Sequence, residues 1–196
     1  VIVKYLVENG AEINAKDEHG KTALHLAIDK SSLDVVKYLV ENGAEVNAKD
    51  EEGKRALHLA SKRGNVDIVK YLVENDAEIN AKDEHGKTAL HLATIESNAD
   101  ILKYLVENGA EVNAKDEEGK TELHLATKRW HVYFVKYLVE NGAAINTKDE
   151  HGKTALHLAI DEWSLDVVKY LVENGAEVNA KDEHGKTALH LAIDKW

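Results

Sequence analysis

The chain has 196 residues, of which 43% are hydrophobic and 31% charged, with a formal net charge of −11 and no cysteine. The acidic balance argues against nucleic acid or an anionic membrane surface as the main partner, and no apolar run approaches the roughly 18 residues of a membrane span. The lack of cysteine excludes disulfides and thiolate zinc sites and fits a cytoplasmic or other intracellular location.

The first predicted element is the second helix of a repeat, inside which the chain begins. Its stretch Val1–Leu6 matches Asp166–Leu171 later in the chain, where a second helix of a repeat is expected. The opening residues resemble neither an initiator methionine nor a signal peptide, which indicates a fragment or a processed chain.

The next stretch, residues 16–30, combines a polar loop with the start of a helix. Its sequence is KDEHGKTALHLAIDK. Thr22 stands immediately before an apolar run, where its hydroxyl can meet the free N–H groups of the first helical turn. A first helix is therefore predicted to begin after Thr22 and to run through Ala27.

A second helix is predicted over residues 33–42, and an extended polar loop over residues 44–54. Asn42-Gly43 ends this helix because glycine adopts the left-handed conformation cheaply, and Gly53 serves the tight turn of the loop. Neither helix would be stable alone at about ten residues. Its apolar face comprises Leu33, Val36, Leu39 and Val40.

One period of 33 residues covers the chain. The Lys16–Lys30 segment returns unchanged at Lys181–Lys195, with variants between them, and no linker interrupts the array. We therefore predict one elongated domain, 1–196. A natural fragment and an engineered array both fit this copying. The predicted units are a partial repeat 1–16, full repeats 17–49, 50–82, 83–115, 116–148 and 149–181, and a partial repeat 182–196.

The stretch Asp17–Ala27, DEHGKTALHLA, and its five later copies resemble the ankyrin-repeat signature. Two positions depart from the family pattern. Ala23 stands where the family usually has proline, and only one copy has the usual glycine at the turn between the two helices, at Gly64. The other copies carry Ser31, Ser97, Trp130, Trp163 and Trp196 at that turn.

The resemblance implies an all-α solenoid of helix-turn-helix repeats joined by β-hairpin loops. It also implies a protein–protein interaction scaffold that binds a protein partner through its concave face and hairpin tips, with no cofactor. On the resemblance, the contact residues are the hairpin tips, represented by Glu18, His19 and Lys21, and the ends of the first helices.

Eleven histidines invite a metal or acid–base interpretation, but six of them occur once per repeat, five in a Thr-x-Leu-His context and His58 after Arg55. We expect each of the six to fix the start of a first helix by a hydrogen bond. Neighbouring repeats are too far apart for their histidines to share a zinc ion, whose ligands lie about 2 Å from the metal. The carboxylates also recur in every repeat, whereas a catalytic pair should break the symmetry. We therefore expect no metal site and no enzyme activity. The six histidines are His25, His58, His91, His124, His157 and His190.

The positions that vary between copies are the best candidates for partner binding. Pairs of residues at the ends of the first helices differ in charge and size, while the hairpins hardly vary. Unselected variation at exposed sites explains the same pattern equally well. The candidate pairs are Lys62-Arg63, Ile95-Glu96, Lys128-Arg129 and Asp161-Glu162, beside Asp29-Lys30 and Asp194-Lys195.

The fourth repeat is the least regular. It reads Trp130-His131-Val132-Tyr133-Phe134, and Tyr133 replaces an aspartate of the other copies. Trp130, Trp163 and Trp196 occupy one equivalent position and could form an exposed row, and clustered aromatic residues are enriched in binding hot spots. The alternative is that each indole folds over its own turn. We count Trp130, His131, Tyr133 and Trp163 among the partner-binding candidates.

A second function class is a structural module that assembles with itself. The two ends of the chain are complementary parts of one repeat, and an uncapped solenoid end exposes apolar core. Head-to-tail stacking would bury Ile2, Val3 and Leu6 against Leu189, Leu191 and Ile193. We hold this self-association as the alternative to binding a different protein.

Overall fold

A computed structural model describes residues 1–129 and 132–196. Its internal contacts divide the chain into two compact units, Val1–Ala110 and Glu111–Trp196, and each unit is described by itself. The organisation of the chain as one domain stays a prediction.

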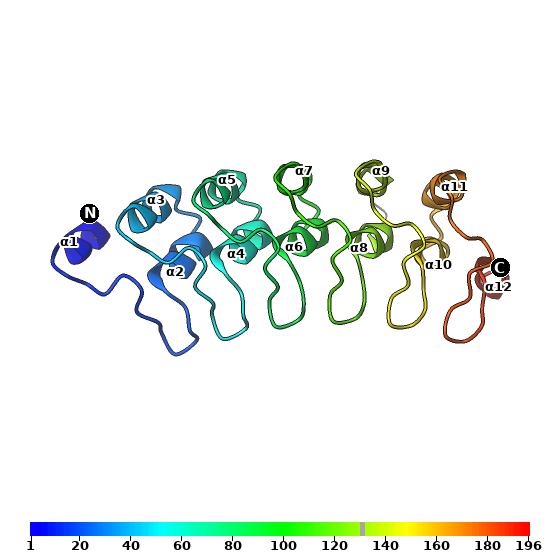
Figure 1. The fold of residues 1–196 in the computed structure, drawn as a ribbon, viewed down its shortest axis with the longest axis horizontal. Coiled ribbons are helices and arrows are strands. Elements are labelled where there is room, and N and C mark those ends of the chain that lie inside the picture. The colour runs from blue at the N-terminus through cyan, green and yellow to red at the C-terminus, as the bar shows by residue number, and fades with distance from the viewer. Residues whose placement is uncertain (130–131) are drawn as a thin grey trace. The chain divides into compact units, whose positions relative to one another are not determined.

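Both units consist of helices and loops, and no strand is present in residues 1–129 and 132–196 (Figure 1). We call the first helix of each repeat the inner helix, because it lies next to the hairpin loops, and the second the outer helix. In the first unit, the inner helices are α2 (Ala23–Asp29), α4 (Ala56–Arg63) and α6 (Ala89–Ile95), and the outer helices are α1 (Ile2–Glu8), α3 (Leu33–Glu41), α5 (Val66–Glu74) and α7 (Ala99–Glu107).

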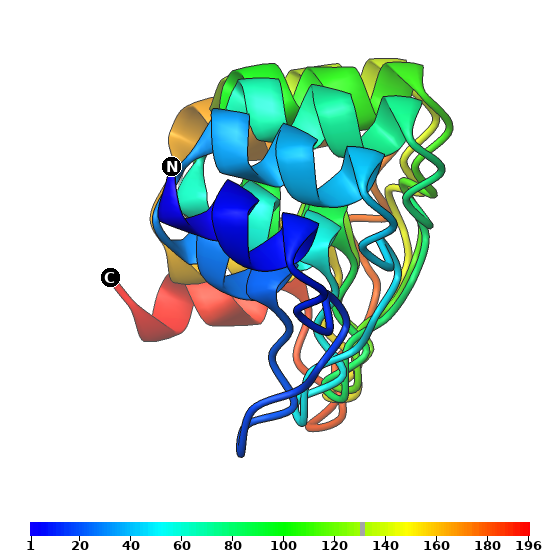
Figure 2. The same cartoon turned by 90° about the vertical axis from the view of Figure 1, so that its left-hand side faces the viewer.

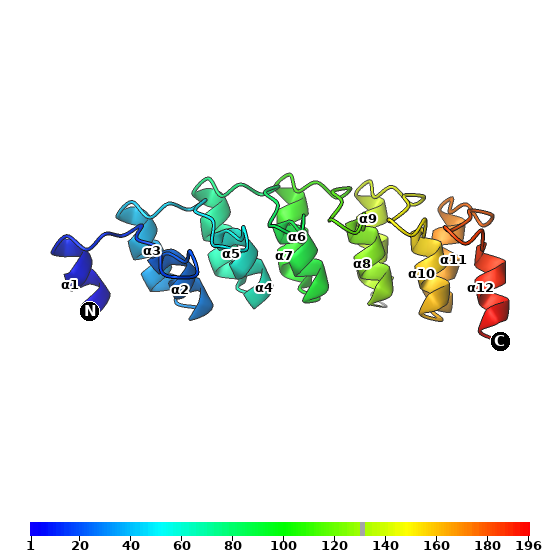
Figure 3. The same ribbon diagram turned by 90° about the horizontal axis from the view of Figure 1, so that it is seen from below.

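The second unit repeats the pattern with three inner and two outer helices in its described residues. The inner helices are α8 (Glu122–Lys128), α10 (Ala155–Asp161) and α12 (Ala188–Asp194), and the outer helices are α9 (Val132–Glu140) and α11 (Leu165–Glu173). Within each unit, helices of one kind run side by side (Figure 3).

Each inner helix starts where the sequence predicts. Thr22 is extended, and its backbone N–H donates to His25 Nδ1 at 3.1 Å, while its hydroxyl lies 2.9 Å from the same atom. The same contacts recur at Thr154 and His157. A histidine at the third helical position thus replaces the glutamate of a usual capping box, which confirms the predicted role of these histidines.

The turn between the inner and outer helix is left-handed in all four copies whose φ is described. Gly64 has φ 72°, and Ser31, Ser97 and Trp163 have φ between 56° and 61°. This conformation costs a non-glycine residue on the order of 1 kcal/mol. The departure from the family glycine therefore leaves the turn type unchanged and adds strain to it.

The core lies between inner and outer helices. Leu24 and Ile28 of α2 and Val36 and Leu39 of α3 are all buried, and α2 packs on both α3 and α4. Burial of each such side chain stabilises the fold by about 1.5–3 kcal/mol. The apolar face predicted for residues 33–42 is therefore the face that packs inward.

The hairpin loops are closed by backbone hydrogen bonds rather than by strands. Asp17 N–H donates to Lys21 C=O at 2.9 Å, and Glu51 N–H of the next loop donates to His19 C=O at 3.1 Å. Gly20 has φ 71°, and a Cβ there would lie 2.8 Å from Glu51 N, so glycine is required by both conformation and close approach. Figure 2 shows the loops of the first unit projecting to the same side.

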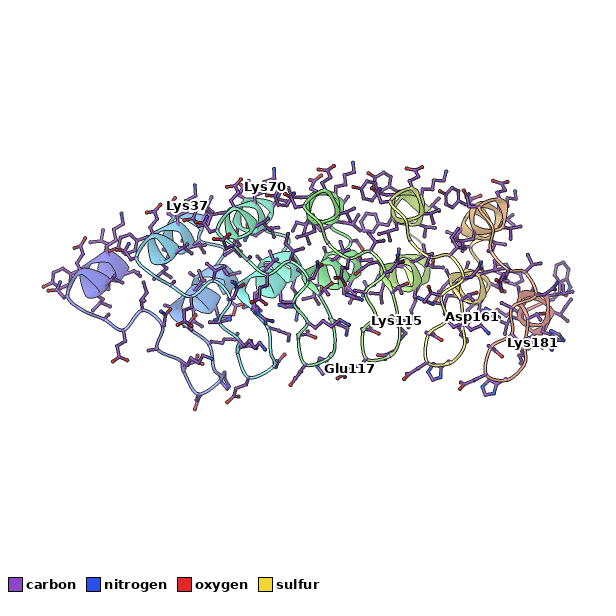
Figure 4. The ribbon with its side chains drawn as sticks, in the orientation of Figure 1. Lys37, Lys70, Lys115, Glu117, Asp161 and Lys181 are labelled. Atoms are coloured by element: carbon purple, nitrogen blue, oxygen red, sulfur yellow. The ribbon has the colours of Figure 1, made fainter. Side chains whose placement is uncertain are left out.

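Polar side chains also join successive repeats, through contacts beyond the predicted ones. Asn14 donates to Gly43 C=O at 3.0 Å and accepts from Glu45 N–H at 2.9 Å. On the outer helices, Lys37 Nζ lies 5.6 Å from the ring centroid of Tyr71 in the next repeat. Figure 4 shows Lys37 and Lys70 on α3 and α5, respectively. The same lysine–tyrosine contact occurs at Lys4–Tyr38, Lys70–Tyr104 and Lys136–Tyr170.

Candidate partner-binding surface

The ends of the inner helices carry the candidate contact residues, and in the first unit they form an ion-pair bridge between repeats. Asp29 ends α2, and Arg63 ends α4. Arg63 Nη2 and Nε lie 2.9 and 3.3 Å from Asp29 Oδ1, and Lys21 Nζ lies 2.9 Å from Asp29 Oδ2. Arg63 therefore already has an anionic partner inside the unit.

The residues of this bridge stabilise one another's charged forms. Burial alone would raise the pKa of Asp29, but hydrogen bonds from Lys21 and Arg63 lower it below its ordinary value. The hydrogen bond to Asp29 raises the pKa of Lys21. Lys62, next to Arg63, is exposed at the same helix end. Of the predicted pair, Lys62 is thus the more available cation, because Arg63 is engaged in the bridge.

In the second unit, Lys128 is the last residue of α8 and Arg129 is its C-cap, and both are exposed. Asp161, labelled in Figure 4, pairs with Lys153 of its own repeat, and its carbonyl accepts from Lys195 of the next repeat. The inner-helix ends of this unit therefore also combine exposed cations with an acid that is already paired.

The remaining candidates differ in accessibility. Ile95 is half-buried at the end of α6, and Glu96 is its exposed C-cap. Glu162 is half-buried beside Asp161. Trp130 and His131 lie outside the described residues.

Tyr133 lies on the outer helix α9, away from the inner-helix ends to which most candidates belong. It is about half exposed. Its ring stacks on Tyr137 at a centroid distance of 6.5 Å and meets buried Phe134 edge-on at 5.9 Å. Tyr133 and Phe134 of the irregular fourth repeat therefore form a local aromatic cluster with Tyr137 on α9.

Trp163 is 59% exposed in its left-handed turn. Of the predicted row of tryptophans, Trp163 and Trp196 are exposed. The indole of Trp163 is therefore largely outside the core, and its role as a contact residue stays a prediction.

We expect Trp163→Gly to raise the free energy of unfolding by about 1 kcal/mol, because glycine relieves the left-handed strain. The exposed Ser31→Gly is a matched comparison at an equivalent turn and should give a similar gain. Urea denaturation of dilute protein measures both. A loss of more than about 2 kcal/mol for Trp163→Gly would mean that the indole packs as core.

The hairpin tips are exposed and their histidines contact acidic neighbours. His19 lies 3.9 Å from Glu18, and His151 Nδ1 lies 2.9 Å from Glu183 in the next loop. Two repeats have glutamate at the position of His19, and there Lys54 pairs with Glu52 and Lys120 with Glu118. In residues 1–129 and 132–196, no group of three or more histidine, aspartate or glutamate side chains is placed to hold a metal ion.

The buried histidines serve the stacking of repeats. His25 Nε2 lies 3.3 Å from Lys54 C=O, and His124 Nε2 lies 3.1 Å from Lys153 C=O, in each case in the following loop. Burial lowers the pKa of His25, His58 and His124 below the ordinary value. These side chains are therefore kept neutral and structural.

Comparison with known proteins agrees with this geometry. The ankyrin-repeat family model matches three times, over residues 1–50, 48–116 and 114–182. The chain belongs to the ankyrin-repeat family. A comparison with curated proteins finds no match. Among solved structures, the chain is similar to the ankyrin repeat domain of Bcl-3, described as a unique member of the IkappaB protein family, at 31% identity and a TM-score of 0.87, covering 97% of this chain and 86% of that one.

Membership of the ankyrin-repeat family confirms the predicted all-helical repeat fold. Ankyrin repeats are generally protein–protein interaction modules and are typically not enzymes. No described helix of this ankyrin-repeat chain is long and apolar enough to cross a membrane.

The variable positions of this ankyrin-repeat chain are recognisable in the sequence, but their contacts are seen only in the structure. Asp29 and Arg63 are 34 residues apart, and the 33-residue period alone would have placed them in adjacent repeats at nearly equivalent positions. The lysine–tyrosine contacts between adjacent outer helices could have been predicted in the same way, because both residues recur with the 33-residue period.

Proposed function

We propose that this chain binds a protein partner through the ends of its inner helices and its hairpin tips. The observation that supports this is the exposure of variable residues on an otherwise copied framework. Lys62, Lys128 and Arg129 are exposed at inner-helix ends, and Trp163 is exposed at the adjoining turn. Tyr133 on α9 and, from the sequence, Trp130 and His131 extend the proposal to the irregular fourth repeat.

The chemistry of these positions favours a partner segment that is acidic and carries an apolar anchor. Lys62-Arg63 and Lys128-Arg129 are cationic pairs in a chain whose formal net charge is −11. An acidic segment would be repelled by most of the chain and attracted at these pairs, which gives orientation and a faster association rate. Exposed tryptophan and tyrosine supply the large apolar contact typical of hot spots.

The test is charge reversal followed by binding. A partner is first identified by affinity capture, and its affinity is then measured by calorimetry for Lys62→Glu, and for Lys128→Glu combined with Arg129→Glu. We expect each variant to bind at least about tenfold more weakly, roughly the 1.4 kcal/mol of a lost charge contact. Added salt should also weaken binding to the unmodified chain, because exposed charges are screened.

Lys169→Glu on the outer helix α11 is the matched control for Lys62→Glu, since it makes the same charge change at an exposed site away from the inner-helix ends. It should bind like the unmodified chain. Unchanged affinity in both reversal variants would exclude the cationic pairs from the contact. If Lys169→Glu also weakens binding, the loss of affinity comes from the changed net charge of the chain and not from a contact at the inner-helix ends.

A further inference from the structure

The hairpin loop that follows α9 differs from the other loops at two neighbouring positions. Thr147 stands where the other copies have alanine, and Ala144 stands where they have glutamate. Thr147 N–H donates to Ala144 C=O at 3.4 Å, so the two residues are the first and the last of one β-turn. This turn therefore carries an extra hydroxyl and lacks a carboxylate. The counterparts are Ala15, Ala48, Ala81, Ala114 and Ala180, and Glu12, Glu45, Glu78, Glu111 and Glu177.

In residues 1–129 and 132–196, the hydroxyl of Thr147 is the one threonine hydroxyl that no hydrogen bond holds. Five others contact the histidine of a capping box, and those of Thr94 and Thr127 donate to the C=O group four residues earlier. The side chain of Thr147 is half-buried, whereas its counterparts Ala48 and Ala114 are buried. The hydroxyl is therefore not needed for the fold and is open to chemical modification.

The segment that follows Thr147 has the conformation and the charge that a protein kinase can select. Thr147 and the next two residues belong to no helix, strand or turn. Asp149 is buried, and its carboxylate accepts from His151 N–H at 3.0 Å and Lys153 N–H at 2.8 Å. Glu150, three residues after Thr147, is exposed. Kinases recognise substrates partly through such charge patterns, and Glu150 is the charge that an approaching enzyme would meet.

Ammonium groups lie beside the chain next to Thr147. Lys115 Nζ lies 3.1 Å from Lys148 C=O, and Lys148 Nζ lies 2.7 Å from Lys181 C=O. Figure 4 labels Lys115 and Lys181 in the second unit. The first and last Cα atoms of a β-turn are less than about 7 Å apart, so a glutamate at position 144 would repel an anion on Thr147. With Ala144, an anion there meets cations instead.

We propose that Thr147 is a phosphorylation site for a serine/threonine kinase that selects an acidic residue after its acceptor. In this reaction the Thr147 oxygen attacks the γ-phosphorus of a nucleoside triphosphate, and the bond from that phosphorus to the leaving diphosphate breaks. The hydroxyl proton passes to the catalytic aspartate of the kinase. The phosphate adds a charge of about −1.5 to −2 to the loop, and Lys115 and Lys148 balance it.

Two serines also have an aspartate three residues later, but their conformation differs from that of Thr147. Ser31 and Ser97 have φ of 56° and 61° in left-handed turns. The aspartates that follow them, Asp34 and Asp100, lie in the first turns of α3 and α7. A kinase cleft binds its substrate as an extended segment, and a tight turn followed by a helix does not offer one. The geometry therefore favours Thr147 over both serines.

The test is phosphorylation of the folded 196-residue chain by a recombinant serine/threonine kinase that requires an acidic residue three positions after its acceptor, with magnesium and ATP. We expect one phosphoryl group per chain, located at Thr147 by tandem mass spectrometry. Thr147→Ala should take up none, and it should fold normally because it gives the residue of the other copies. Glu150→Gln should lower the initial rate about tenfold, the effect of one lost charge contact. Glu84→Gln, the matched change in another loop, should leave the rate unchanged.

Urea unfolding of the phosphorylated chain tests the surroundings of the phosphate. Phosphorylation should raise the urea midpoint of the unmodified chain, because the phosphate gains lysine contacts. Lys115→Gln should remove this rise, and Ala144→Glu should turn it into a fall through repulsion between like charges. A midpoint that falls equally in the unmodified chain and in Ala144→Glu would overturn the assignment, because the turn would then not suit a phosphate.

The mapping experiment has two results that would also overturn the proposal. One is phosphorylation of a synthetic peptide of residues 141–153 with none on the folded chain, because the fold would then withhold the hydroxyl. The other is a phosphate on Ser31 or Ser97 and none on Thr147. Neither result bears on binding of a protein partner at the inner-helix ends.

Discussion

The free energy of unfolding is expected to fall steeply as the pH drops below about 6.5, the ordinary pKa of histidine. The cause is the burial of three capping histidines, His25, His58 and His124, which lowers their pKa. In His25, Nδ1 accepts the Thr22 N–H at 3.1 Å, so the neutral ring carries its proton on Nε2, which faces Lys54 C=O at 3.3 Å. A second proton on Nδ1 would point at a donor and would also place a charge in the core.

The lowered pKa values of the buried histidines determine the direction in which stability changes with pH. Burial lowers the pKa of His25, His58 and His124 in the folded chain, so the unfolded chain binds more protons as the pH falls. Stability is then fully present above about 6.5 and is lost as the pH falls toward the folded-state pKa values. Each histidine contributes at most about 1.4 kcal/mol per pH unit, and the three together about 4 kcal/mol per unit.

Urea denaturation at several pH values between 8 and 5 measures the slope. This window separates the histidines from the aspartates, because the pKa values of Asp17 and Asp29 are lowered from an ordinary value near 3.8 and their contribution disappears only below about pH 4. His184→Gln, at an exposed hairpin tip, should leave the slope unchanged. A stability that is flat from pH 7 to pH 5 would show that the buried rings accept a proton without penalty.

Replacing Arg55 by threonine is expected to raise the free energy of unfolding by about 2 kcal/mol. Arg55 stands at the N-cap of α4, where the other complete inner helices have threonine, and it is buried. Its Nε and Nη1 have no hydrogen-bond partner in the described part of the chain. A buried polar group without a partner costs about 1–3 kcal/mol, and the threonine hydroxyl would regain the contact with His58 Nδ1.

The substitution also removes the ion pair between Arg55 Nη2 and Glu78 Oε2, which are 3.1 Å apart. Because Glu78 is 56% exposed, water replaces this contact, and the stability lost with the ion pair is small. Thermal or urea unfolding measures the gain. Arg55→Ala should give only part of it, because alanine removes the guanidinium without restoring the cap, which contributes about 1 kcal/mol. A less stable Arg55→Thr would mean that the pair with Glu78 outweighs the buried donors.

The repeat framework of this chain was predictable from the sequence alone. The 33-residue period, the helix starts at Thr22 and its copies, and the ends at Asn42-Gly43 all appear in the structure as predicted. These features depend on contacts between residues close in the chain, such as Thr22 with His25. Local contacts of this kind leave a direct pattern in the sequence, and five of the six copies have both the threonine and the histidine.

Other features were decided by tertiary structure. The sequence marks Arg63 as a variable cation, but only the fold brings it to Asp29, 34 residues earlier. Glu122 replaces an alanine of the other copies, and only the structure shows that it is completely buried. Leu33 and Leu165 begin equivalent helices, yet Leu165 is the more exposed, because α5 packs beside α3 and no outer helix after α11 is present among the described residues. Burial and ion pairing depend on which repeats pack against one another, and repeats with the same local sequence can have different neighbours in the fold.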